Sequence, residues 1–408
     1  MDNAKPVVIV GASHAAAETV TQLRRQGWQG GITVIGDEIH LPYQRPPLSK
    51  AYFKGDVPVE KLLIRPEDVY VKAECEMLLG QRVKRLDLLD NFVVLDDDTQ
   101  VEFGALVLCT GTRARLLPIA GADADNMMVL RTLDDVNNIR ARVTPHSKLL
   151  VVGAGYIGLE IAASAVSLGV EVTVLEAQER VLARVTSPET SEYFTNLHAQ
   201  AGVTIELGVG ISEFVHSDDH APSKVLLNDG REIEFDNAVI GIGVVPNTEL
   251  AEAAGVLCDN GIVVDEFTAT NIPGVYAIGD CCNHPSALYQ RRIRLESVPN
   301  ALEQARIVAQ SICGNPEAYD SVPWFWSDQY DVKLQTVGLL EGYDTAVVRG
   351  EPKENKFAVF YLLKGRLLAV DAINSPIDFM VGKKLVANKV DLSAYDLSDP
   401  ALNLKSLV

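Results

Sequence analysis

A short apolar run, a glycine turn and a helix-like stretch open the chain. The run is Val7–Val10, residues 11–16 read Gly-Ala-Ser-His-Ala-Ala, and the helix-like stretch continues to Arg25. A second apolar run, residues 32–35, ends shortly before Asp37. Short apolar runs bounded by turn signals are typical of strands buried in a parallel sheet. This part of the sequence therefore predicts a strand–helix–strand unit.

The same pattern returns in the middle of the chain. Residues 149–152 form an apolar run, residues 153–158 read Gly-Ala-Gly-Tyr-Ile-Gly, and a helix-like stretch continues to Leu168. A further apolar run, residues 170–175, ends at Glu176. The second turn begins 142 residues after the first, far beyond the repeat length of solenoid proteins. The repeat therefore predicts two domains of one type.

Both units have the order of a Rossmann unit, which binds a dinucleotide at the turn after its first strand. The first glycine permits the tight turn, the second lets the backbone approach a pyrophosphate, and the helix N-terminus offers N–H groups to phosphate. An acidic side chain about 20 residues later accepts hydrogen bonds from a ribose. Glu176 follows Gly153 by 23 residues and Asp37 follows Gly11 by 26. Both units therefore have the pattern of a dinucleotide site.

The two glycine turns are unequal. The second is complete, whereas the first has Ser13 and Ala16 at its second and third glycine positions. Ala is accepted at the third position, but Ser13 places a side chain where a phosphate must come close, so it either hydrogen-bonds the phosphate or shifts the ligand. In the second unit Glu176 favours NAD, because a carboxylate binds the free 2′-hydroxyl and repels the 2′-phosphate of NADP. Arg180, four residues later, leaves some use of NADPH open.

Further motifs carry a family resemblance. Residues 106–111 read Leu-Val-Leu-Cys-Thr-Gly, residues 274–280 read Gly-Val-Tyr-Ala-Ile-Gly-Asp, and residues 324–329 read Trp-Phe-Trp-Ser-Asp-Gln. With the two glycine turns, and with Arg-Pro-Pro-Leu-Ser-Lys at 45–50, this order resembles the two-dinucleotide-binding flavoprotein reductases. Within them it is most similar to the NADH-dependent ferredoxin reductases of bacterial oxygenase systems, the putidaredoxin reductase type. Cys109 stands where that family usually has Ala.

The resemblance implies an α/β fold with two Rossmann-like domains of the glutathione reductase type and an α+β C-terminal domain. Residues 1–113 and 244–316 would form an FAD-binding domain. Residues 114–243 would form an NADH-binding domain inserted into it, and residues 317–408 would form the C-terminal domain.

The resemblance also implies which residues contact FAD. Asp280 would hold the ribityl chain and Val298 would lie beside the isoalloxazine ring, although Asp280 taken alone could simply cap the next helix. The other expected FAD contacts lie at the first glycine turn and at segments that match the family: Gly11, Ser13, His14, Ala15, Ala16, Asp37, Glu38, Arg45, Pro47, Lys50, Val83, Thr110, Gly111, Arg131 and Gly279.

The NADH site is expected around the second glycine turn, and its residues are Gly153, Gly155, Tyr156, Ile157, Gly158, Glu160, Glu176 and Gly243. The candidate catalytic residues are Lys50, Glu160 and Trp326. A cation near the reactive edge of a flavin stabilises the negative charge that arrives with hydride. The resemblance pairs Lys50 with Glu160, so that the pair also orients the nicotinamide, and it places Trp326 near the flavin on the acceptor side. Tyr156 either covers the flavin until NADH displaces it or is a packing aromatic.

Composition excludes several other classes of protein. The 408 residues include 36 Lys or Arg and 55 Asp or Glu, a net charge of −19 that is unsuited to nucleic acid or to an anionic membrane. Residues 149–170 carry one charge but four glycines, which favours strand, turn and helix over a membrane span. Six cysteines without a Cys-x-x-Cys spacing predict no metal site and no disulfide framework, and they favour the reducing cytoplasm.

The expected electron acceptor is a 2Fe-2S ferredoxin that serves a cytochrome P450 or a ring-hydroxylating dioxygenase. Such ferredoxins are generally acidic, so a local basic cluster must offset the net charge. The densest cluster is Arg291, Arg292 and Arg294 with Arg306, and we expect docking there through electrostatic steering. A solvated loop is the alternative. The sequence does not identify the ferredoxin or the oxygenase, and it leaves the oligomeric state open between a monomer and a weak dimer.

Other functions stay open on the same scaffold. A flavoprotein reductase of a disulfide or of another small molecule generally needs a redox-active cysteine after the first Rossmann unit, and residues 38–74 contain none. Cys281 and Cys282 are the only adjacent pair. A flavin-carrying redox-signalling protein would use the same two cofactor sites, but it would be expected to carry additional basic or targeting segments, which the sequence does not show.

Overall fold

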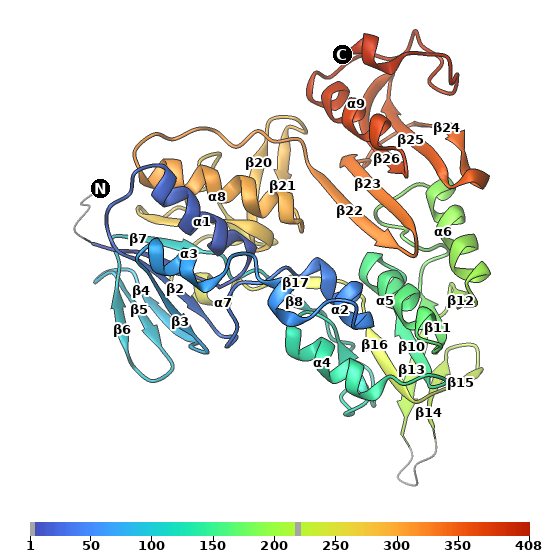
Figure 1. Ribbon diagram of the computed structural model, residues 1–408, viewed down its shortest axis with the longest axis horizontal. Helices are drawn as coiled ribbons and strands as arrows, with labels where there is room; N and C mark the ends of the chain where they lie inside the picture. The colour runs from blue at the N-terminus through green and yellow to red at the C-terminus, as the bar shows by residue number, and fades with distance from the viewer. Residues whose placement is uncertain (1–4, 217–221) are drawn as a thin grey trace. The chain divides into compact units, whose positions relative to one another are not determined.

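The computed structural model describes residues 5–216 and 222–408, and the chain divides into two compact units. The first unit contains Met1–Gln44, Val59–Arg113 and Val245–Pro323, and the second contains Arg45–Pro58, Ala114–Val244 and Trp324–Val408. Two of the boundaries between the units fall within strands, β8 (Thr112–Ala114) and β17 (Val244–Pro246) (Figure 1). Each unit is described separately.

A five-stranded parallel sheet forms the centre of the first unit. Its order is β19-β7-β1-β2-β3, and the central strand β1 pairs in parallel with β2 and with β7. The strands are β1 (Val7–Val10), β2 (Ile32–Gly36), β3 (Cys75–Leu79), β7 (Ala105–Leu108) and β19 (Val275–Ala277). Helices α1 (His14–Arg25) and α8 (Val298–Ile312) pack on one face of this sheet.

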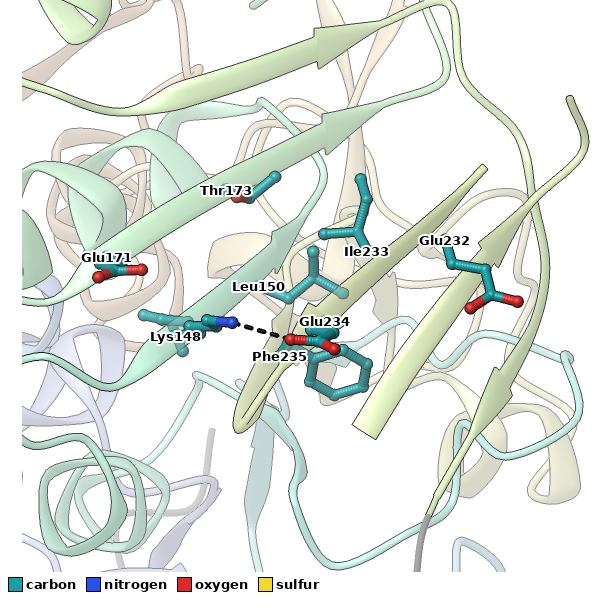
Figure 2. Close-up of a pocket in the computed structure, with 9 residues that line it drawn as sticks. Lys148, Leu150, Glu171, Thr173, Glu232, Ile233, Glu234 and Phe235 are labelled. Atoms are coloured by element: carbon teal, nitrogen blue, oxygen red, sulfur yellow. Dashed lines mark hydrogen bonds and ion pairs between the residues drawn. The ribbon is translucent and has the colours of Figure 1, made fainter. Parts of the chain in front are cut away.

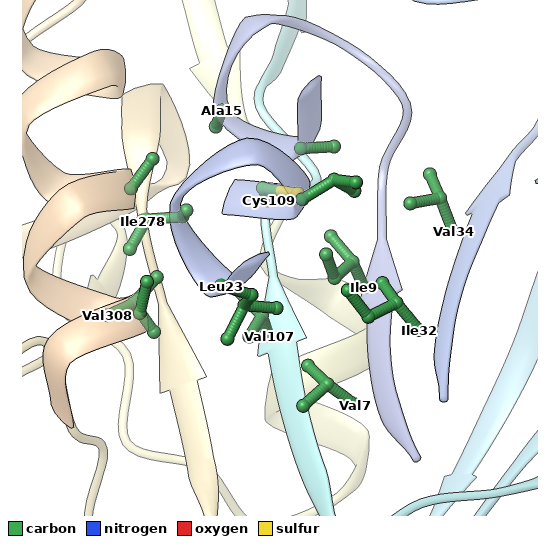
Figure 3. Packing of buried hydrophobic residues seen from close by; sticks show 14 of the residues in the cluster. Val7, Ile9, Ala15, Leu23, Ile32, Val34, Val107, Cys109, Ile278 and Val308 are labelled. Carbon is green, nitrogen blue, oxygen red and sulfur yellow. The ribbon is translucent and has the colours of Figure 1, made fainter. Parts of the chain in front are cut away.

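Both faces of this sheet are buried by alternate residues of its strands. Val7 and Ile9 of β1 belong to the core cluster under α1 and α8, whereas Val8 and Val10 belong to the cluster on the other face (Figure 3). A strand that is covered on both faces has no polar side, and this is why β1 is an unbroken apolar run in the sequence.

The remaining elements of the first unit form smaller layers. An antiparallel sheet contains β4 (Val83–Asp87), β5 (Phe92–Leu95) and β6 (Gln100–Glu102), and another sheet contains β18 (Ile262–Val263), β20 (Cys282–Ser286) and β21 (Arg291–Ile293). The short helices are α3 (Glu67–Lys72), α7 (Glu249–Ala253), η2 (Val59–Leu62) and η3 (Gly279–Cys281).

The second unit contains another five-stranded parallel sheet, with the order β12-β11-β10-β16-β9. Its strands are β9 (Met127–Val129), β10 (Lys148–Val152), β11 (Glu171–Glu176), β12 (Thr204–Leu207) and β16 (Asn237–Ile240). Its helices are α4 (Leu133–Arg142), α5 (Tyr156–Ser167) and α6 (Pro188–Gln200), and an antiparallel sheet contains β13 (Ile211–Val215), β14 (Ser223–Leu227) and β15 (Glu232–Phe235). The segment Arg45–Pro58 contributes η1 (Pro46–Ser49) and α2 (Ala51–Lys54).

The C-terminal part of the second unit is an antiparallel sheet with the order β22-β23-β26-β25-β24. Its strands are β22 (Trp324–Gln329), β23 (Val332–Gly338), β24 (Thr345–Glu351), β25 (Lys356–Leu363) and β26 (Arg366–Ile373). Helix α9 (Pro376–Ala387) packs on β23 and β26, and the short turns η4 (Pro352–Glu354) and η5 (Leu404–Leu407) complete the chain (Figure 1).

The repeated strand–helix–strand unit predicted from the sequence is confirmed in both parallel sheets, as β1, α1 and β2 and as β10, α5 and β11. The predicted α/β fold class, with an α+β domain at the C-terminus, is confirmed too. Residues 149–170 contain most of β10 and all of α5, as expected. Within residues 5–216 and 222–408, no helix has the length and apolar character needed to span a membrane.

Candidate functional site

Predicted FAD contacts of the first unit follow the carboxyl ends of four neighbouring parallel strands. Gly11 follows β1, Asp37 follows β2, Thr110 comes two residues after β7, and Gly279 comes two residues after β19. The carboxyl ends of parallel strands lie at one edge of a sheet, and ligands of open α/β sheets bind at that edge. The structure therefore brings these positions together.

The glycine turn is packed against its neighbours in the first unit. Gly11 has a φ of +111°, and a Cβ atom there would lie 2.2 Å from the carbonyl oxygen of Cys109. Ser13 is the N-cap residue of α1, with His14 as the first helical residue. Ala15 and Ala16 are buried beneath the turn, and a Cβ atom on Gly279 would lie 3.6 Å from that of Ala15. The small residues of the first motif thus allow α1 to approach the η3 turn.

Other predicted contacts of the first unit are positioned by hydrogen bonds or by apolar packing. Asn247 holds Thr110 and Gly111 in place: it accepts a 2.7 Å hydrogen bond from the Thr110 hydroxyl, and its own N–H donates to the carbonyl oxygen of Gly111. Glu38 accepts a 2.5 Å hydrogen bond from the hydroxyl of Tyr43. Val83 begins β4 and packs against the apolar cluster beneath the sheet.

Two predicted contacts of the first unit lie in α8 and η3. Val298 is the first residue of α8, and Asp280 lies inside η3, which packs on α8. The carbonyl oxygen of Asp280 accepts a 3.1 Å hydrogen bond from Arg294.

Each of the three glycines in the turn of the second unit has a different role. Gly153 has a φ of +104°, and a Cβ atom there would meet the carbonyl oxygen of Gly241 at 2.6 Å. Gly155 is the N-cap of α5, and a Cβ atom there would meet nothing within 4 Å. A Cβ atom on Gly158 would lie 2.1 Å from the carbonyl oxygen of Gly153. The first and third glycines therefore serve the tight turn and close packing, and the second leaves open space for a ligand.

Glu176 ends β11 beside this turn. One carboxylate oxygen accepts a 2.8 Å hydrogen bond from the backbone N–H of Ala154, and the other accepts one of 2.9 Å from Gln178. Arg180 donates to the Ser191 hydroxyl at 2.6 Å and to the carbonyl oxygen of Ala183 at 2.8 Å. The carboxylate is therefore fixed at the glycine turn, and the guanidinium is held by α6 and the preceding loop.

Two further predicted residues complete this edge of the second unit. Ile157, at the start of α5, is 40% exposed, which is high for an isoleucine. Gly243 follows β16 with a φ of +107°, and its carbonyl oxygen accepts a hydrogen bond from the backbone N–H of Arg115.

Lys50 and Glu160 form an ion pair inside the second unit. The Lys50 Nζ atom lies 2.6 Å from Glu160 Oε2, and the side chains are 18% and 6% exposed. The same carboxylate accepts hydrogen bonds from the hydroxyls of Ser49 at 2.5 Å and Ser327 at 2.6 Å. The sequence predicted the pair from the family resemblance, but neither serine was expected there.

The segment Arg45–Pro58 is attached to the second unit by several hydrogen bonds. Arg45 donates to the carbonyl oxygen of Arg131 at 2.7 Å, and the Ser164 hydroxyl donates to that of Ser49 at 2.7 Å. Pro47 lies in the η1 turn, between Arg45 and Ser49 in the sequence. The predicted FAD contacts Arg45, Pro47, Lys50 and Arg131 therefore all belong to the second unit.

Tyr156 and Trp326, the two predicted aromatic residues, lie on opposite sides of strand β22. Its side chains alternate between two faces. Phe325 lies 4.4 Å from the Tyr156 ring, measured between centroids, and Ser327 reaches Glu160 from the same face. Trp326 lies on the other face beside Trp324, whose ring packs on Phe379 of α9. The structure thus brings Tyr156 near the Lys50–Glu160 pair and directs Trp326 away from it. Burial raises the pKa of Tyr156 well above its ordinary value.

The predicted docking arginines are engaged by neighbouring groups in the first unit. Arg292 donates to the carbonyl oxygens of Val264 and Asn283. Arg294 is ion-paired with Glu296 at 2.7 Å and is 11% exposed. A second ion pair joins Arg306 to Glu317 at 2.7 Å. Arg291 is exposed on β21.

All six cysteines are free, and all have raised thiol pKa values, with burial as the largest cause. Cys281 and Cys282, the adjacent pair, are both buried. Because the thiolate is the reactive form of cysteine, burial that disfavours it makes a thiol a poor redox nucleophile. Within the described residues, no group of three or more His, Cys, Asp or Glu is placed to hold a metal ion.

One surface hollow of about 350 Å³ lies elsewhere in the second unit (Figure 2). It is lined by Lys148 and Glu171, the first residues of β10 and β11, and by residues of β15. Lys148 is ion-paired with Glu234 across it at 2.9 Å. The glycine turn and Glu176 lie at the opposite, carboxyl ends of the same strands, so the hollow is not the predicted dinucleotide site.

Comparison with known proteins matches two consecutive parts of the chain to two family models. A family model described as pyridine nucleotide-disulphide oxidoreductase matches residues 5–305, and a second, described as reductase C-terminal, matches residues 324–408.

Individual relatives are similar over almost their whole length. Putidaredoxin reductase of Pseudomonas putida is 42% identical over 406 residues, which cover 98% of this chain and 96% of that protein. Rhodocoxin reductase of Rhodococcus erythropolis is 42% identical over 399 residues, covering 98% and 93%. The crystal structure of a covalent putidaredoxin reductase–putidaredoxin complex matches with a TM-score of 0.95 and 42% identity, over 99% of this chain and 98% of that one.

Proposed function

The chain belongs to the pyridine nucleotide-disulphide oxidoreductase family, and from this membership we propose that it is an NADH:ferredoxin oxidoreductase that contains FAD. It takes hydride from NADH and passes single electrons to a 2Fe-2S ferredoxin, which in turn serves a P450 or a ring-hydroxylating dioxygenase. The observation that carries the proposal is the presence of two parallel sheets, each with a glycine turn and an acidic side chain at its carboxyl edge.

The residues at the two edges fit the two dinucleotides. In the first unit, the tight turn at Gly11, the N-cap Ser13 and the acidic Asp37 would hold FAD, with Asp280 and Val298 at the neighbouring turn. In the second unit, the open space at Gly155 would admit the pyrophosphate of NADH. We extend this to the domains: residues 1–113 and 244–316 serve FAD, residues 114–243 serve NADH, and residues 317–408 form the C-terminal domain.

Glu176 supports NADH rather than NADPH as the donor. Two backbone N–H groups hold its carboxylate at the glycine turn, where a ribose 2′-hydroxyl can donate to it. Arg180 is bound to Ser191 and Ala183, so the nearby cation is already occupied by protein acceptors. A 2′-phosphate would thus meet a fixed negative charge.

Bound FAD supplies the step between a hydride donor and a one-electron acceptor, because a flavin accepts a hydride and releases electrons singly. Lys50 provides the positive charge that favours arrival of the hydride, and Glu160 holds the ammonium group in one place. Trp326 remains a predicted contact on the acceptor side.

The thiol-using alternative lacks a suitable cysteine. That reaction needs an accessible thiol with a lowered pKa, whereas the pKa of every cysteine in this chain is raised. An electron-transfer flavoprotein needs no thiol. We also propose a cytoplasmic location, on the sequence grounds given above.

An anaerobic NADH titration tests the proposal. The purified protein should show flavin absorption that bleaches on addition of NADH and returns when a 2Fe-2S ferredoxin is added, with two ferredoxins reduced per NADH because hydride carries two electrons. A purified protein without flavin absorption would overturn the proposal. Bleaching by NADH without transfer to any ferredoxin would favour a reductase of small molecules.

A further inference from the structure

A buried chain of hydrogen bonds continues beyond Glu160. The Glu160 residue is buried, and its Oε2 atom accepts from Ser49 and Lys50, while its Oε1 atom accepts from Ser327 at 2.6 Å. The Ser327 side chain is in turn contacted by the amide of Gln329 at 3.2 Å. Both lie on the face of β22 that is directed toward α5.

The chain then crosses to helix α6 and ends at the surface of the second unit. Gln329 Oε1 lies 2.8 Å from His198 Nε2, and His198 Nδ1 lies 3.0 Å from the hydroxyl of Tyr330. Ser327, Gln329 and His198 are at most 1% exposed, whereas Tyr330 is 36% exposed. A continuous polar path therefore joins the surface to the buried ion pair.

The chemistry of the groups fixes the direction of every bond in this chain. A carboxylate can only accept, so Ser327 donates its single proton to Glu160 and must accept from Gln329. The Gln329 oxygen then faces His198 and can only accept, so the proton of the neutral imidazole lies on Nε2. His198 Nδ1 accepts from Tyr330. All four bonds point toward Glu160.

Burial keeps this direction stable near neutral pH. It lowers the pKa of His198 below its ordinary value, so the ring is uncharged at pH 7. It also raises the pKa of Tyr330 to about 12, so the hydroxyl keeps its proton. Hydrogen bonds that are aligned in one direction polarise one another, and each strengthens the next.

We propose that Ser327, Gln329 and His198 are positioning residues, which act through Glu160 to fix the Lys50 ammonium during hydride transfer from NADH. The inference rests on the proposed function of the Lys50–Glu160 pair. Ser327 fixes Oε1 of Glu160, and this leaves Oε2 for Lys50 and Ser49. Gln329 and His198 hold the Ser327 hydroxyl in the donating direction.

Titratable side chains lie near Glu160 on several elements of the second unit. Lys50 faces it from the segment Arg45–Pro58, and Tyr156 lies on its own helix within electrostatic reach. Asp371 of β26 lies beyond Tyr156 and also acts on that side chain. From α6 the titratable group is His198, which reaches Glu160 only through Gln329 and Ser327.

Stopped-flow reduction of the holoenzyme by NADH tests the role of Ser327. In Ser327→Ala, with flavin content and circular dichroism unchanged, the limiting rate should fall about tenfold, the loss expected for one hydrogen bond to a charged group. The NADH concentration for half-maximal rate should change by less than about twofold. Ser327→Thr, which keeps the hydroxyl on a strand-favouring residue, should restore most of the rate.

A double-mutant cycle separates positioning from general damage. In a Glu160→Gln background, the further change Ser327→Ala should alter the rate by less than about twofold, because its target has lost its charge. Ser187→Ala is the matched control: Ser187 is a fully buried serine of the same unit, bonded to Tyr361 and not to Glu160. It should leave the rate unchanged.

Two results would overturn the inference: a limiting rate of Ser327→Ala like that of the parent protein, or an undiminished loss of rate in the Glu160→Gln background. A parent protein that NADH cannot reduce would instead overturn the proposed function.

Discussion

Gly158 shows how closely the second glycine turn is packed. A Cβ atom there would lie 2.1 Å from the backbone oxygen of Gly153, a contact that only a shift of the main chain could relieve. Gly155 is the reverse case, since a Cβ atom there would meet nothing within 4 Å. Packing therefore explains the glycine at 158, whereas the glycine at 155 leaves the open space in which we propose that the pyrophosphate binds.

Glu176 is expected to set the preference for NADH over NADPH. Glu176→Gln keeps an acceptor oxygen but removes the charge that repels a 2′-phosphate. We expect the ratio of kcat/KM for NADH to that for NADPH to fall by roughly tenfold or more, as for the loss of one hydrogen bond to a charged group. Steady-state assays with each nucleotide at pH 7.5 give this ratio.

The control for this change lies on the same strand. Glu171→Gln removes one negative charge at the other end of β11, beside the surface hollow. It should leave the nucleotide preference as it is in the parent protein. An equal fall in both variants would assign the effect to net charge and contradict a specific role for Glu176.

At the scale of elements, β22 shows what a sequence pattern can and cannot supply. The alternation of Trp324, Trp326 and the residues between them predicts a strand with two distinct faces. It does not say which face meets α5, because that depends on the contact between the C-terminal sheet and a helix more than 150 residues earlier. Ser327 therefore carried no local signal of its contact with Glu160.

The C-terminal sheet also contains a buried acidic side chain. Asp371 of β26 is fully buried and accepts hydrogen bonds from Tyr361 at 2.6 Å and from Thr336 at 2.8 Å. Thr190, near the start of α6, donates to it at 3.4 Å. Burial raises the pKa of Asp371 to about 6, and the three donors only partly oppose that rise.

This raised pKa predicts a pH-dependent stability. The folded protein binds the proton more tightly than the unfolded chain does, so the contribution of Asp371 is present below about pH 4 and is lost as the pH rises through about 6. A difference of about two pKa units corresponds to roughly 3 kcal/mol. In Asp371→Asn this loss should be absent. As the pH rises from 4 to 7.5, the thermal midpoint of the parent protein should therefore fall relative to that of Asp371→Asn.

Asp391→Asn is the control, because Asp391 is exposed and its pKa is lowered by hydrogen bonds to Ser393. It titrates below this pH range and should show the same pH dependence as the parent protein. If the midpoints of Asp371→Asn and the parent follow parallel curves from pH 4 to 7.5, Asp371 does not titrate there.

At the scale of the whole molecule, the sequence predicted the repeated sheets because their evidence is local. Each has an apolar run, a glycine turn and an acid at a fixed spacing. The attachment of Arg45–Pro58 to the second unit depends instead on single hydrogen bonds, such as Arg45 to the Arg131 carbonyl and Tyr52 to Asn137. Each bond joins residues more than 80 positions apart, and no local sequence pattern links the two partners of either bond.

The chain has a net charge of −19, so an acidic ferredoxin would need a local basic surface on it. The candidate surface is the cluster of Arg291, Arg292, Arg294 and Arg306 on the first unit. Arg294 and Arg306 are ion-paired with Glu296 and Glu317, and Arg292 is bound to backbone oxygens. Pairing with an acid reduces the positive potential that an acidic ferredoxin would meet. Arg291 of β21 is exposed, so a reversal of its charge tests docking at this cluster directly.

Reversal of the charge at this position should weaken docking alone. Arg291→Glu is expected to raise the KM for a 2Fe-2S ferredoxin by roughly three- to tenfold at low ionic strength, since charged rims act mainly on association rate. The effect should shrink as salt is added, because salt screens exposed charges. NADH-dependent reduction of a neutral dye should stay the same, because that reaction needs no protein docking.

Arg231→Glu makes the same change of charge in the second unit, at an arginine that is 48% exposed. If ferredoxin responds to the local field at β21, only Arg291→Glu raises its KM. If both variants raise it equally, the partner senses net charge, and the cluster has no special role. An unchanged KM in Arg291→Glu at every salt concentration would place the docking surface elsewhere, on a face that binds the ferredoxin without the help of this arginine.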